Sequence, residues 1–167
     1  MISIVGPTMN RMTVVMTMIV TTAVALMLWG CGKRPVMSQA SFVHLQSGGW
    51  RHDAPLAFTP QYADSATTYS LTLAVRHTNS YAYSNLSLVV DVINVDSLVT
   101  RHKLDMRLAD GYGNWLGGGF GTLYQDTAMV AAVIDPDDAT RVIVWQAMQG
   151  CDTLRGITDI GLIARPL

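Results

Sequence analysis

Two stretches of strict alternation constrain the fold more than any other feature of the sequence. Residues 68–76 place Tyr69, Leu71, Leu73 and Val75 on one side and Ser70, Thr72, Ala74 and Arg76 on the other. Residues 86–93 alternate in the same way, through Leu86, Leu88, Val90 and Val92. A period of two is typical of a half-buried strand. We expect the two strands to form one antiparallel pair, joined by the polar, aromatic loop 77–85.

Further strand-like segments follow at short intervals, separated by glycine and Asx turns. They are residues 42–45, 53–58, 98–100, 102–108, 122–124, 128–134, 140–148 and 157–164. Turns are expected at Gly48-Gly49, at Asn94–Ser97 and at Asp135–Asp138. After the N-terminal segment, no stretch shows a convincing period of 3.6. This pattern predicts an all-β fold, an antiparallel β-sandwich that is Ig-like or jelly-roll-like.

The stretch Leu108–Gly121 (LADGYGNWLGGGFG) is the most unusual in composition, since six of its fourteen residues are glycine. Glycine permits positive φ and close backbone approach, but it loses the most entropy on ordering. We therefore take this stretch as the centre of the domain and expect it to fold tightly against something. It is either a tight loop or bulge with Trp115 packed inward, or a binding surface.

The N-terminus predicts a bacterial lipoprotein signal. Arg11 precedes the uncharged, apolar run 12–28, which ends in Leu28-Trp29-Gly30-Cys31. We expect a signal peptide over 1–30, a lipidated Cys31 with a tether over 31–40, and one β-sandwich domain over 41–167. The alternative is an uncleaved anchor in which Cys31 is incidental. Gly32-Lys33-Arg34 lacks the Asp associated with inner-membrane retention, which favours the outer membrane.

Charge and motifs exclude several classes of function. The chain has 167 residues and a net charge of −1, and only Arg11 is charged before Cys31, so the remainder has 10 basic and 12 acidic residues. No basic field for nucleic acid is present. We expect no cofactor, no metal and no catalytic residue. The four histidines are scattered, and residues 135–138 fit a turn better than a calcium loop. Asp110 with Arg76 is the one acid–base pair to inspect, and a structural salt bridge is the expected role.

Two aromatic loops are candidates for an interaction surface. One contains Tyr81 and Tyr83, and the other contains Tyr112, Trp115 and Phe120. Exposed aromatic rings bind sugars or protein partners with little loss of entropy, whereas buried rings belong to the core. The sequence leaves both alternatives open. The lone Cys151 is expected to be a small buried residue.

Three segments resemble the GldH gliding motility lipoproteins, in the same order along the chain. They are residues 76–86 (RHTNSYAYSNL), residues 108–121, and residues 146–162 around QAMQ and LRGITDIGL. Gln149, where Arg is expected, and Trp29 in the lipobox depart from the family pattern. The matching positions are Arg76, Tyr81, Tyr83, Asn85, Asp110, Gly113, Trp115, Gly117, Gly119 and Gly121.

This resemblance implies a cell-envelope lipoprotein, needed for surface gliding and linked to secretion of motility adhesins, with no established enzymatic activity. The expected partners are a membrane, through Cys31, and other envelope proteins of that machinery. The candidate interaction surface comprises Arg76, Tyr81, Tyr83, Asn85, Asp110, Tyr112 and Trp115. A carbohydrate-binding envelope lipoprotein that uses its exposed aromatic residues is the alternative.

Overall fold

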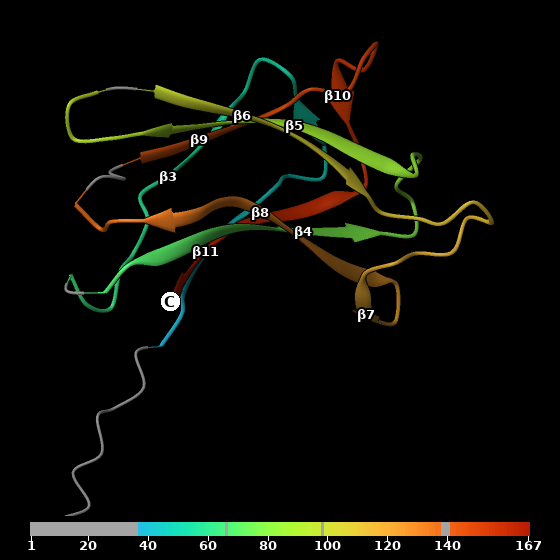
Figure 1. The fold of residues 1–167 in the computed structure, drawn as a ribbon. Coiled ribbons are helices and arrows are strands. Elements are labelled where there is room, and N and C mark those ends of the chain that lie inside the picture. Colours follow the sequence, from blue (N-terminus) through green and yellow to red (C-terminus); the bar gives the residue numbers. More distant parts are fainter. Residues whose placement is uncertain (1–36, 66, 98, 138–140) are drawn as a thin grey trace, which may run out of the picture. The chain divides into compact units, whose positions relative to one another are not determined.

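The protein is a sandwich of two antiparallel sheets in a computed structural model, which describes residues 37–65, 67–97, 99–137 and 141–167. One sheet has the strand order β1-β11-β4-β8-β7 and the other has the order β3-β9-β5-β6 (Figure 1). Their bounds are β1 Gln39–His44, β3 Leu56–Phe58, β4 Tyr69–Thr78, β5 Asn85–Ile93, β6 Val99–Arg107, β7 Gly118–Phe120, β8 Leu123–Ile134, β9 Arg141–Gln146 and β11 Ile157–Pro166. A short ribbon pairs β2 (Trp50–Arg51) with β10 (Thr153–Leu154). The predicted all-β antiparallel sandwich is therefore confirmed.

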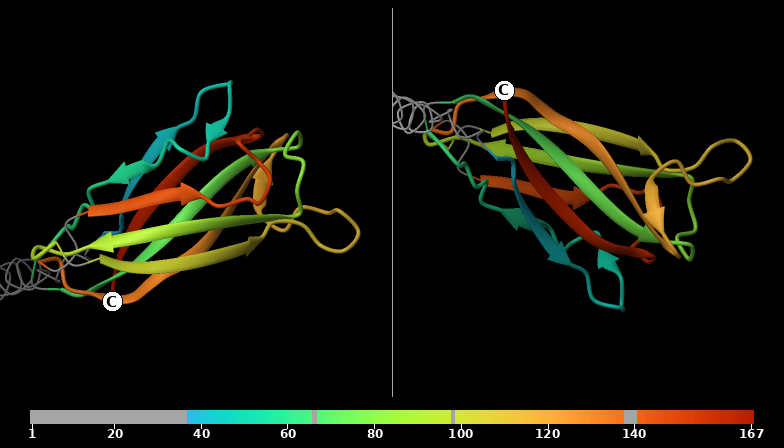
Figure 2. Two further views of the ribbon diagram at one scale, coloured as in Figure 1. Left: turned by 90° about the horizontal axis from the view of Figure 1, so that it is seen from above. Right: turned by 90° about the horizontal axis from the view of Figure 1, so that it is seen from below.

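The core lies between the two sheets, where each strand contributes every second side chain. Figure 2 shows one sheet overlying the other when the domain is seen from above and from below. The apolar series that the alternation identified in β4 and β5 fills this space, together with Val142, Val144, Ile160 and Leu162. Burial of about 25 cal/mol per Å² of apolar surface is the main force that holds such layers together.

The expected pairing of the first two alternating strands is wrong. β4 pairs with β11 and β8, whereas β5 pairs with β6 and β9, so the two strands belong to opposite sheets. Residues 79–84 cross from one sheet to the other, and Tyr81 of this crossing is buried. Both strands present an apolar face to the same core, and alternation alone does not specify which strand is the hydrogen-bonded neighbour.

The expectation that β4 is only half buried is also wrong. Ser70, Thr72 and Ala74 on its outward side are all buried. β4 is the central strand of the five-stranded sheet, so its neighbours on both sides, β11 and β8, cover these small side chains. One of those neighbours carries Gly161 opposite Ala74, and the ring of Phe42 packs against that glycine.

The remaining strand predictions hold in place, with changed lengths. The segments 98–100 and 102–108 form one strand, β6, and the segments 122–124 and 128–134 form one strand, β8. The sequence did not predict β7 or the β2–β10 ribbon.

The described part of the chain contains no helix that is long and apolar enough to cross a bilayer. Cys31 and the signal segment lie outside the described residues.

Candidate functional site: an aromatic end and an outer groove

A buried histidine organises one end of the sandwich. His77, near the end of β4, is fully buried, and its ring lies against those of Trp115, Tyr124 and Tyr81 at centroid distances of 4.5, 5.5 and 5.8 Å. His77 Nε2 lies 3.3 Å from Asp126 Oδ2, and Nδ1 lies 3.3 Å from the Thr78 carbonyl oxygen. Burial raises the pKa of the Asp126 carboxyl above its ordinary value, and the facing His77 opposes that rise. The cluster joins both predicted aromatic loops to one buried polar pair.

The first aromatic loop has one ring inside and one outside. Tyr81 is 4% exposed, and its hydroxyl donates a hydrogen bond to the Asn85 carbonyl oxygen at 2.8 Å. Gly156, at φ +87°, lies directly against the Tyr81 backbone, where any Cβ would collide. Tyr83 is 39% exposed, and a hydrogen bond with the Cys151 thiol raises the pKa of its hydroxyl. The expected small buried role for Cys151 holds in part, because this residue is half buried against the core.

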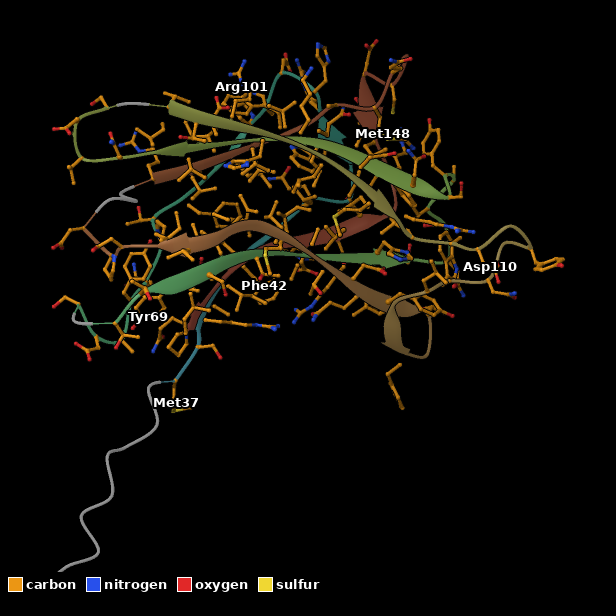
Figure 3. All side chains as sticks on the ribbon, viewed as in Figure 1. Met37, Phe42, Tyr69, Arg101, Asp110 and Met148 are labelled. Carbon is orange, nitrogen blue, oxygen red and sulfur yellow. The ribbon has the colours of Figure 1, made fainter. Side chains whose placement is uncertain are left out.

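The glycine-rich stretch forms a loop that extends beyond the end of the sandwich (Figures 1 and 2; Asp110 is labelled in Figure 3). Asp110 closes it: its Oδ1 accepts hydrogen bonds from the backbone N–H groups of Tyr112 and Asn114 at 2.8 and 2.9 Å, and its Oδ2 accepts from Asn114 Nδ2 at 2.9 Å. These hydrogen bonds, those of Asn114 first, hold the pKa of Asp110 below its usual range. Tyr112 is 95% exposed on the loop, while Trp115 packs back onto His77. The part of the stretch around Asp110 is thus ordered by its own hydrogen bonds, and the stretch presents two exposed rings, Tyr112 and Phe120.

At two of the glycines the backbone of the stretch lies so close to β8 that no side chain fits. A Cβ on Gly117 would collide with the Asp126 carboxylate, and a Cβ on Gly119 would collide with the Leu123 carbonyl and the Tyr124 ring. Around Trp115, Gly117 and Gly119 the stretch therefore folds tightly against the domain, as expected, whereas its part around Tyr112 projects. It lies at one end of the sandwich, however, so the expectation that it forms the centre is wrong.

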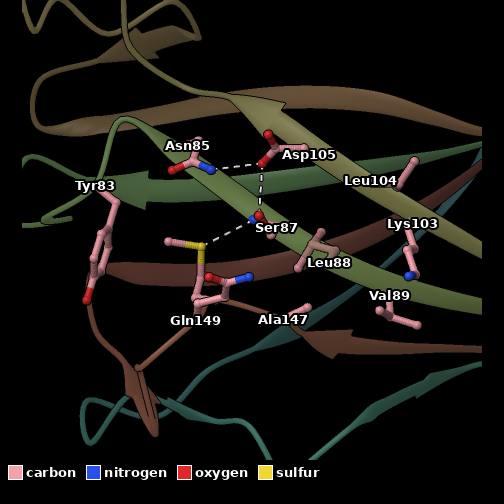
Figure 4. A pocket seen from close by; sticks show the side chains of 11 residues that line it. Tyr83, Asn85, Ser87, Leu88, Val89, Lys103, Leu104, Asp105, Ala147 and Gln149 are labelled. Atoms are coloured by element: carbon pink, nitrogen blue, oxygen red, sulfur yellow. Dashed lines mark hydrogen bonds between the residues drawn. The ribbon is translucent and has the colours of Figure 1, made fainter.

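A groove of about 700 Å³ opens on the outer face of the four-stranded sheet (Figure 4). Asp105 of β6 stands in it, and its Oδ1 accepts hydrogen bonds from Asn85 Nδ2 at 2.8 Å and Ser87 Oγ at 2.9 Å. These bonds lower the pKa of Asp105, so the groove holds a fixed negative charge. Tyr83 and Met148 line the groove, and the Ser87 backbone N–H donates to the Met148 sulfur at 3.3 Å.

The seven predicted surface residues do not form one surface. The buried Tyr81 and the half-buried Trp115 belong to the aromatic cluster around His77. Tyr83 and Asn85 line the groove, and Asp110 and Tyr112 belong to the projecting loop. Arg76 lies on the outer face of the other sheet, where its Nε donates to Gln125 Oε1 at 2.9 Å and its guanidinium lies 4.2 Å from the Phe42 ring centroid. The expected Arg76–Asp110 salt bridge is wrong, since these two described residues form no ion pair.

Two features of the site did not follow from the sequence. The His77–Asp126 pair joins residues 49 positions apart, and Ser87 faces Asp105 only through the register of β5 with β6. The alternating pattern of 86–93 placed Ser87 on the outer face, and the same parity in 102–108 placed Asp105 there. The sequence therefore indicated that both residues lie on outer faces. It did not indicate that they are in contact, because that depends on which strands pair and in which register.

The histidine of the aromatic cluster is closed to substrate. His77 and Asp126 are a histidine–carboxylate pair, but both ring nitrogens of the fully buried His77 face protein acceptors, so the ring cannot reach a substrate. No cluster of three or more metal-ligating side chains occurs among the residues that the structure describes. The Asp137 backbone N–H donates to Asp135 Oδ1 at 3.0 Å, which is an Asx turn, as the sequence predicted for residues 135–138.

Comparison with known proteins gives a family match over most of the domain. Residues 38–163 match the GldH lipoprotein family. A curated relative, the "Gliding motility lipoprotein GldH homolog" of Christiangramia forsetii, is 29% identical over 139 residues, which cover 78% of this chain and 83% of the relative.

Among solved structures, the chain is similar to the VP2 subviral particle of infectious bursal disease virus, with 17% identity and a TM-score of 0.32 over 80% of this chain. The structure of the Gx strain of that virus matches over 78% of the chain, with 10% identity and a TM-score of 0.30. The chain spans about a third of the length of these viral chains, 33% and 32% respectively.

Proposed function

The chain belongs to the GldH lipoprotein family, and from this premise we propose that it is a lipid-anchored, non-enzymatic component of the gliding motility machinery and its associated secretion system. The relative from Christiangramia forsetii carries the name of a gliding motility lipoprotein. Signal peptide cleavage before Cys31 and attachment of a diacylglyceryl group to its thiol would hold the sandwich at the cell envelope, on the periplasmic face of the outer membrane. Stable anchoring needs more than one acyl chain, as lipoprotein processing supplies.

One observation carries the interaction role: Tyr112 is 95% exposed on a loop whose backbone is fixed by Asp110. Because the backbone that carries this ring is already ordered, a partner that covers the ring does not also have to order the loop. Leu116, Phe120 and Leu123, in the same loop and the β7–β8 hairpin, are also exposed, so this end offers several apolar side chains. We assign partner contact to this aromatic end.

The test is site-specific photocrosslinking in a gliding host whose own copy has been deleted. A photoreactive amino acid replaces Tyr112 or, as the matched control, His52, which is exposed in the turn that follows β2. We expect crosslinks from position 112 to envelope proteins of the motility and secretion machinery, and none of these from position 52. Tyr112→Ala should fold normally and reduce colony spreading.

Each part of the proposal has its own contrary outcome. Normal spreading and adhesin secretion in the deletion strain would overturn the role in motility. Full complementation by Tyr112→Ala, with identical crosslinks at the two positions, would overturn the assignment of the aromatic end. Mass spectrometry of the mature chain reads the acylation of Cys31 independently.

The groove favours a second candidate, which is carbohydrate binding. Proteins commonly bind sugars with an aromatic ring beside fixed hydrogen-bonding groups, and Tyr83 lies in the groove with Asn85, Ser87 and Asp105. Tyr81 and Trp115, both expected as possible sugar platforms, are packed in the aromatic cluster instead. Binding of envelope oligosaccharides that Asp105→Ala abolishes and Tyr112→Ala leaves intact would support this candidate. Equal binding by both variants would remove it.

A further inference from the structure

The outer face of the five-stranded sheet carries an uncharged strip. Strand register places two adjacent rows of outward side chains across β1, β11, β4 and β8. One row is Ala40, Ile163, Thr72 and Met129, and the other is Phe42, Gly161, Ala74 and Thr127. None of the eight residues is charged. Met129 is 60% exposed and Phe42 is 37% exposed, so the strip presents large apolar side chains to its surroundings.

Charged residues flank the strip instead of interrupting it. Arg76 lies beyond the Phe42 row, with its guanidinium 4.2 Å from the Phe42 ring centroid, and Arg165, paired with Ser70, lies beyond the Met129 row. Asp159 stands beside Arg76 in the same row, and its carboxylate lies 3.1 Å from His44 Nδ1. Arginine beside apolar surface is a pattern suited to a bilayer interface, because the stem covers apolar groups while the guanidinium reaches the headgroups.

The position of the anchor limits which surface this strip can meet. Gln39, the first residue of β1, follows Cys31 by eight residues, and an extended chain of that length spans at most about 28 Å. β1 is an edge strand of the five-stranded sheet and contributes Ala40 and Phe42 to the strip. An acyl group on Cys31 would therefore keep the strip within reach of the bilayer.

We propose that the outer face of the five-stranded sheet rests on the membrane that holds the lipid anchor, with Phe42 and Met129 in the headgroup region. This proposal rests on the acylation of Cys31 in the proposed function. It leaves the groove on the opposite outer face and the aromatic end free for partners. The strip sets the orientation of the domain, while the acyl chains supply the affinity.

The size of the strip favours a tethered contact over a protein interface. Four strands at about 4.8 Å and two rows of side chains give an area of roughly 20 Å by 14 Å. A stable protein interface covers about 800 Å² on each partner, which is more than this strip provides. A weak contact is sufficient for a tethered domain, because the anchor makes membrane contact intramolecular and its effective concentration high.

The test uses the full acylated chain in vesicles of phosphatidylethanolamine and phosphatidylglycerol. In a Cys151→Ser background, Met129→Cys or the control Lys103→Cys, in the groove on the opposite face, receives an environment-sensitive fluorophore. The Cys31 thiol is blocked by its diacylglyceryl group, which mass spectrometry verifies. We expect aqueous iodide to quench the label at 129 at least three-fold less than the label at 103. Thr127→Cys replaces Met129→Cys if that variant misfolds by circular dichroism.

Equal quenching at the two positions, or stronger protection at 103, would overturn the proposed orientation while leaving the anchor intact. Protection at 129 that appears only at a high protein-to-lipid ratio would also overturn it, because a second copy would then cover the strip. A mature chain without the acyl mass would overturn the anchor itself, and this proposal with it.

Discussion

The two outer faces of the sandwich differ in where their charges lie. On the four-stranded sheet, each outward row carries at least one charged residue, since Asp105, Lys103, Asp91 with Arg101, and Arg141 occupy successive rows. On the five-stranded sheet, two adjacent rows carry none. Both faces belong to strands that use their other side for the same core, so the difference does not arise from folding that core.

The two faces also hold their aromatic residues differently. Trp145 on the charged face has the Arg101 guanidinium 6.0 Å from its ring centroid, and Arg101 is in turn fixed by Asp91. Phe42 on the uncharged face packs against the backbone of Gly161. On the four-stranded sheet the aromatic ring thus lies beside an ion pair, whereas on the five-stranded sheet it lies on backbone without a charged group between them. The faces are thus suited to different neighbours, and substitutions on each face can break or sharpen that contrast.

The largest effect is expected from Gly161→Ala on the uncharged face. The added Cβ collides with the Phe42 ring, which must move away from its packing and from Arg76. Overpacking of this kind costs about 1–3 kcal/mol, to be measured by urea denaturation. In a Phe42→Ala background the same substitution should be neutral or slightly stabilising, because alanine is favoured over glycine in a strand. An equal cost in both backgrounds would show that the ring is not the obstacle.

Asp91→Asn tests the charged face and should cost somewhat less. Asp91 Oδ1 and Oδ2 accept hydrogen bonds from Arg101 at 2.7 and 2.6 Å, which lower the pKa of this carboxyl. Asp91→Asn removes the charge of a buried carboxylate and weakens both of its hydrogen bonds with Arg101, which costs about 1–2 kcal/mol. Because the folded-state pKa is lowered, the stabilisation is present above the ordinary value of about 3.9 and is lost as pH falls through the folded-state pKa.

Urea denaturation of wild type and Asp91→Asn across pH 2–7 measures the stability cost of the substitution and the direction in which that cost changes with pH. The stability difference between wild type and Asp91→Asn should shrink toward low pH. Asp159→Asn is the matched control on the outer face of the five-stranded sheet, beside the uncharged strip. Its partner His44 is largely exposed, so this change should cost less than about 0.5 kcal/mol. A difference that grows on acidification would contradict the assignment to the Arg101 pair.

Asp126→Asn should give a smaller change of the opposite sign. Burial raises the pKa of this carboxyl, so its contribution to stability is present below its unfolded-state pKa and is lost as pH rises through the folded-state pKa. An amide can keep a hydrogen bond with His77 without a buried charge. We expect the variant to match or exceed wild-type stability at pH 7, by less than about 1 kcal/mol. A large loss in thermal denaturation at pH 7 would show that the charge on Asp126 is required.

Much of the fold followed from the sequence because alternation fixes which side chains face the core. The order of residue types alone identifies the apolar series of β4 and β5 and most strand positions. Strand partners did not follow, because β4 and β5 both satisfy the same alternation while lying in opposite sheets. The burial of Ser70, Thr72 and Ala74 depends on β11 and β8 as neighbours, whose paired residues are 53 to 95 positions away in sequence.

The candidate site was less predictable, because exposure in loops is set by distant residues. Tyr81 and Tyr83 are two positions apart in the same loop, yet Tyr81 is buried and Tyr83 is exposed. Gly156, 75 positions later, is the residue that packs on the Tyr81 backbone. The loop of Asp110 is different: its hydrogen bonds reach only as far as Asn114, so its turn is local and the exposure of Tyr112 follows from it.

The smallest effect on stability is expected from exchanging charge between the faces, with Met129→Lys on one and Lys103→Met on the other. Both positions are exposed, so each variant should change the free energy of unfolding by less than about 0.5 kcal/mol in urea denaturation. If Met129→Lys folds as stably as wild type, the uncharged strip is not a requirement of the sheet, and its function must lie in what touches it. If Met129→Lys instead lowers the free energy of unfolding by several kcal/mol, the uncharged strip is required for the stability of the fold. That outcome would remove the reason to seek a membrane on this face.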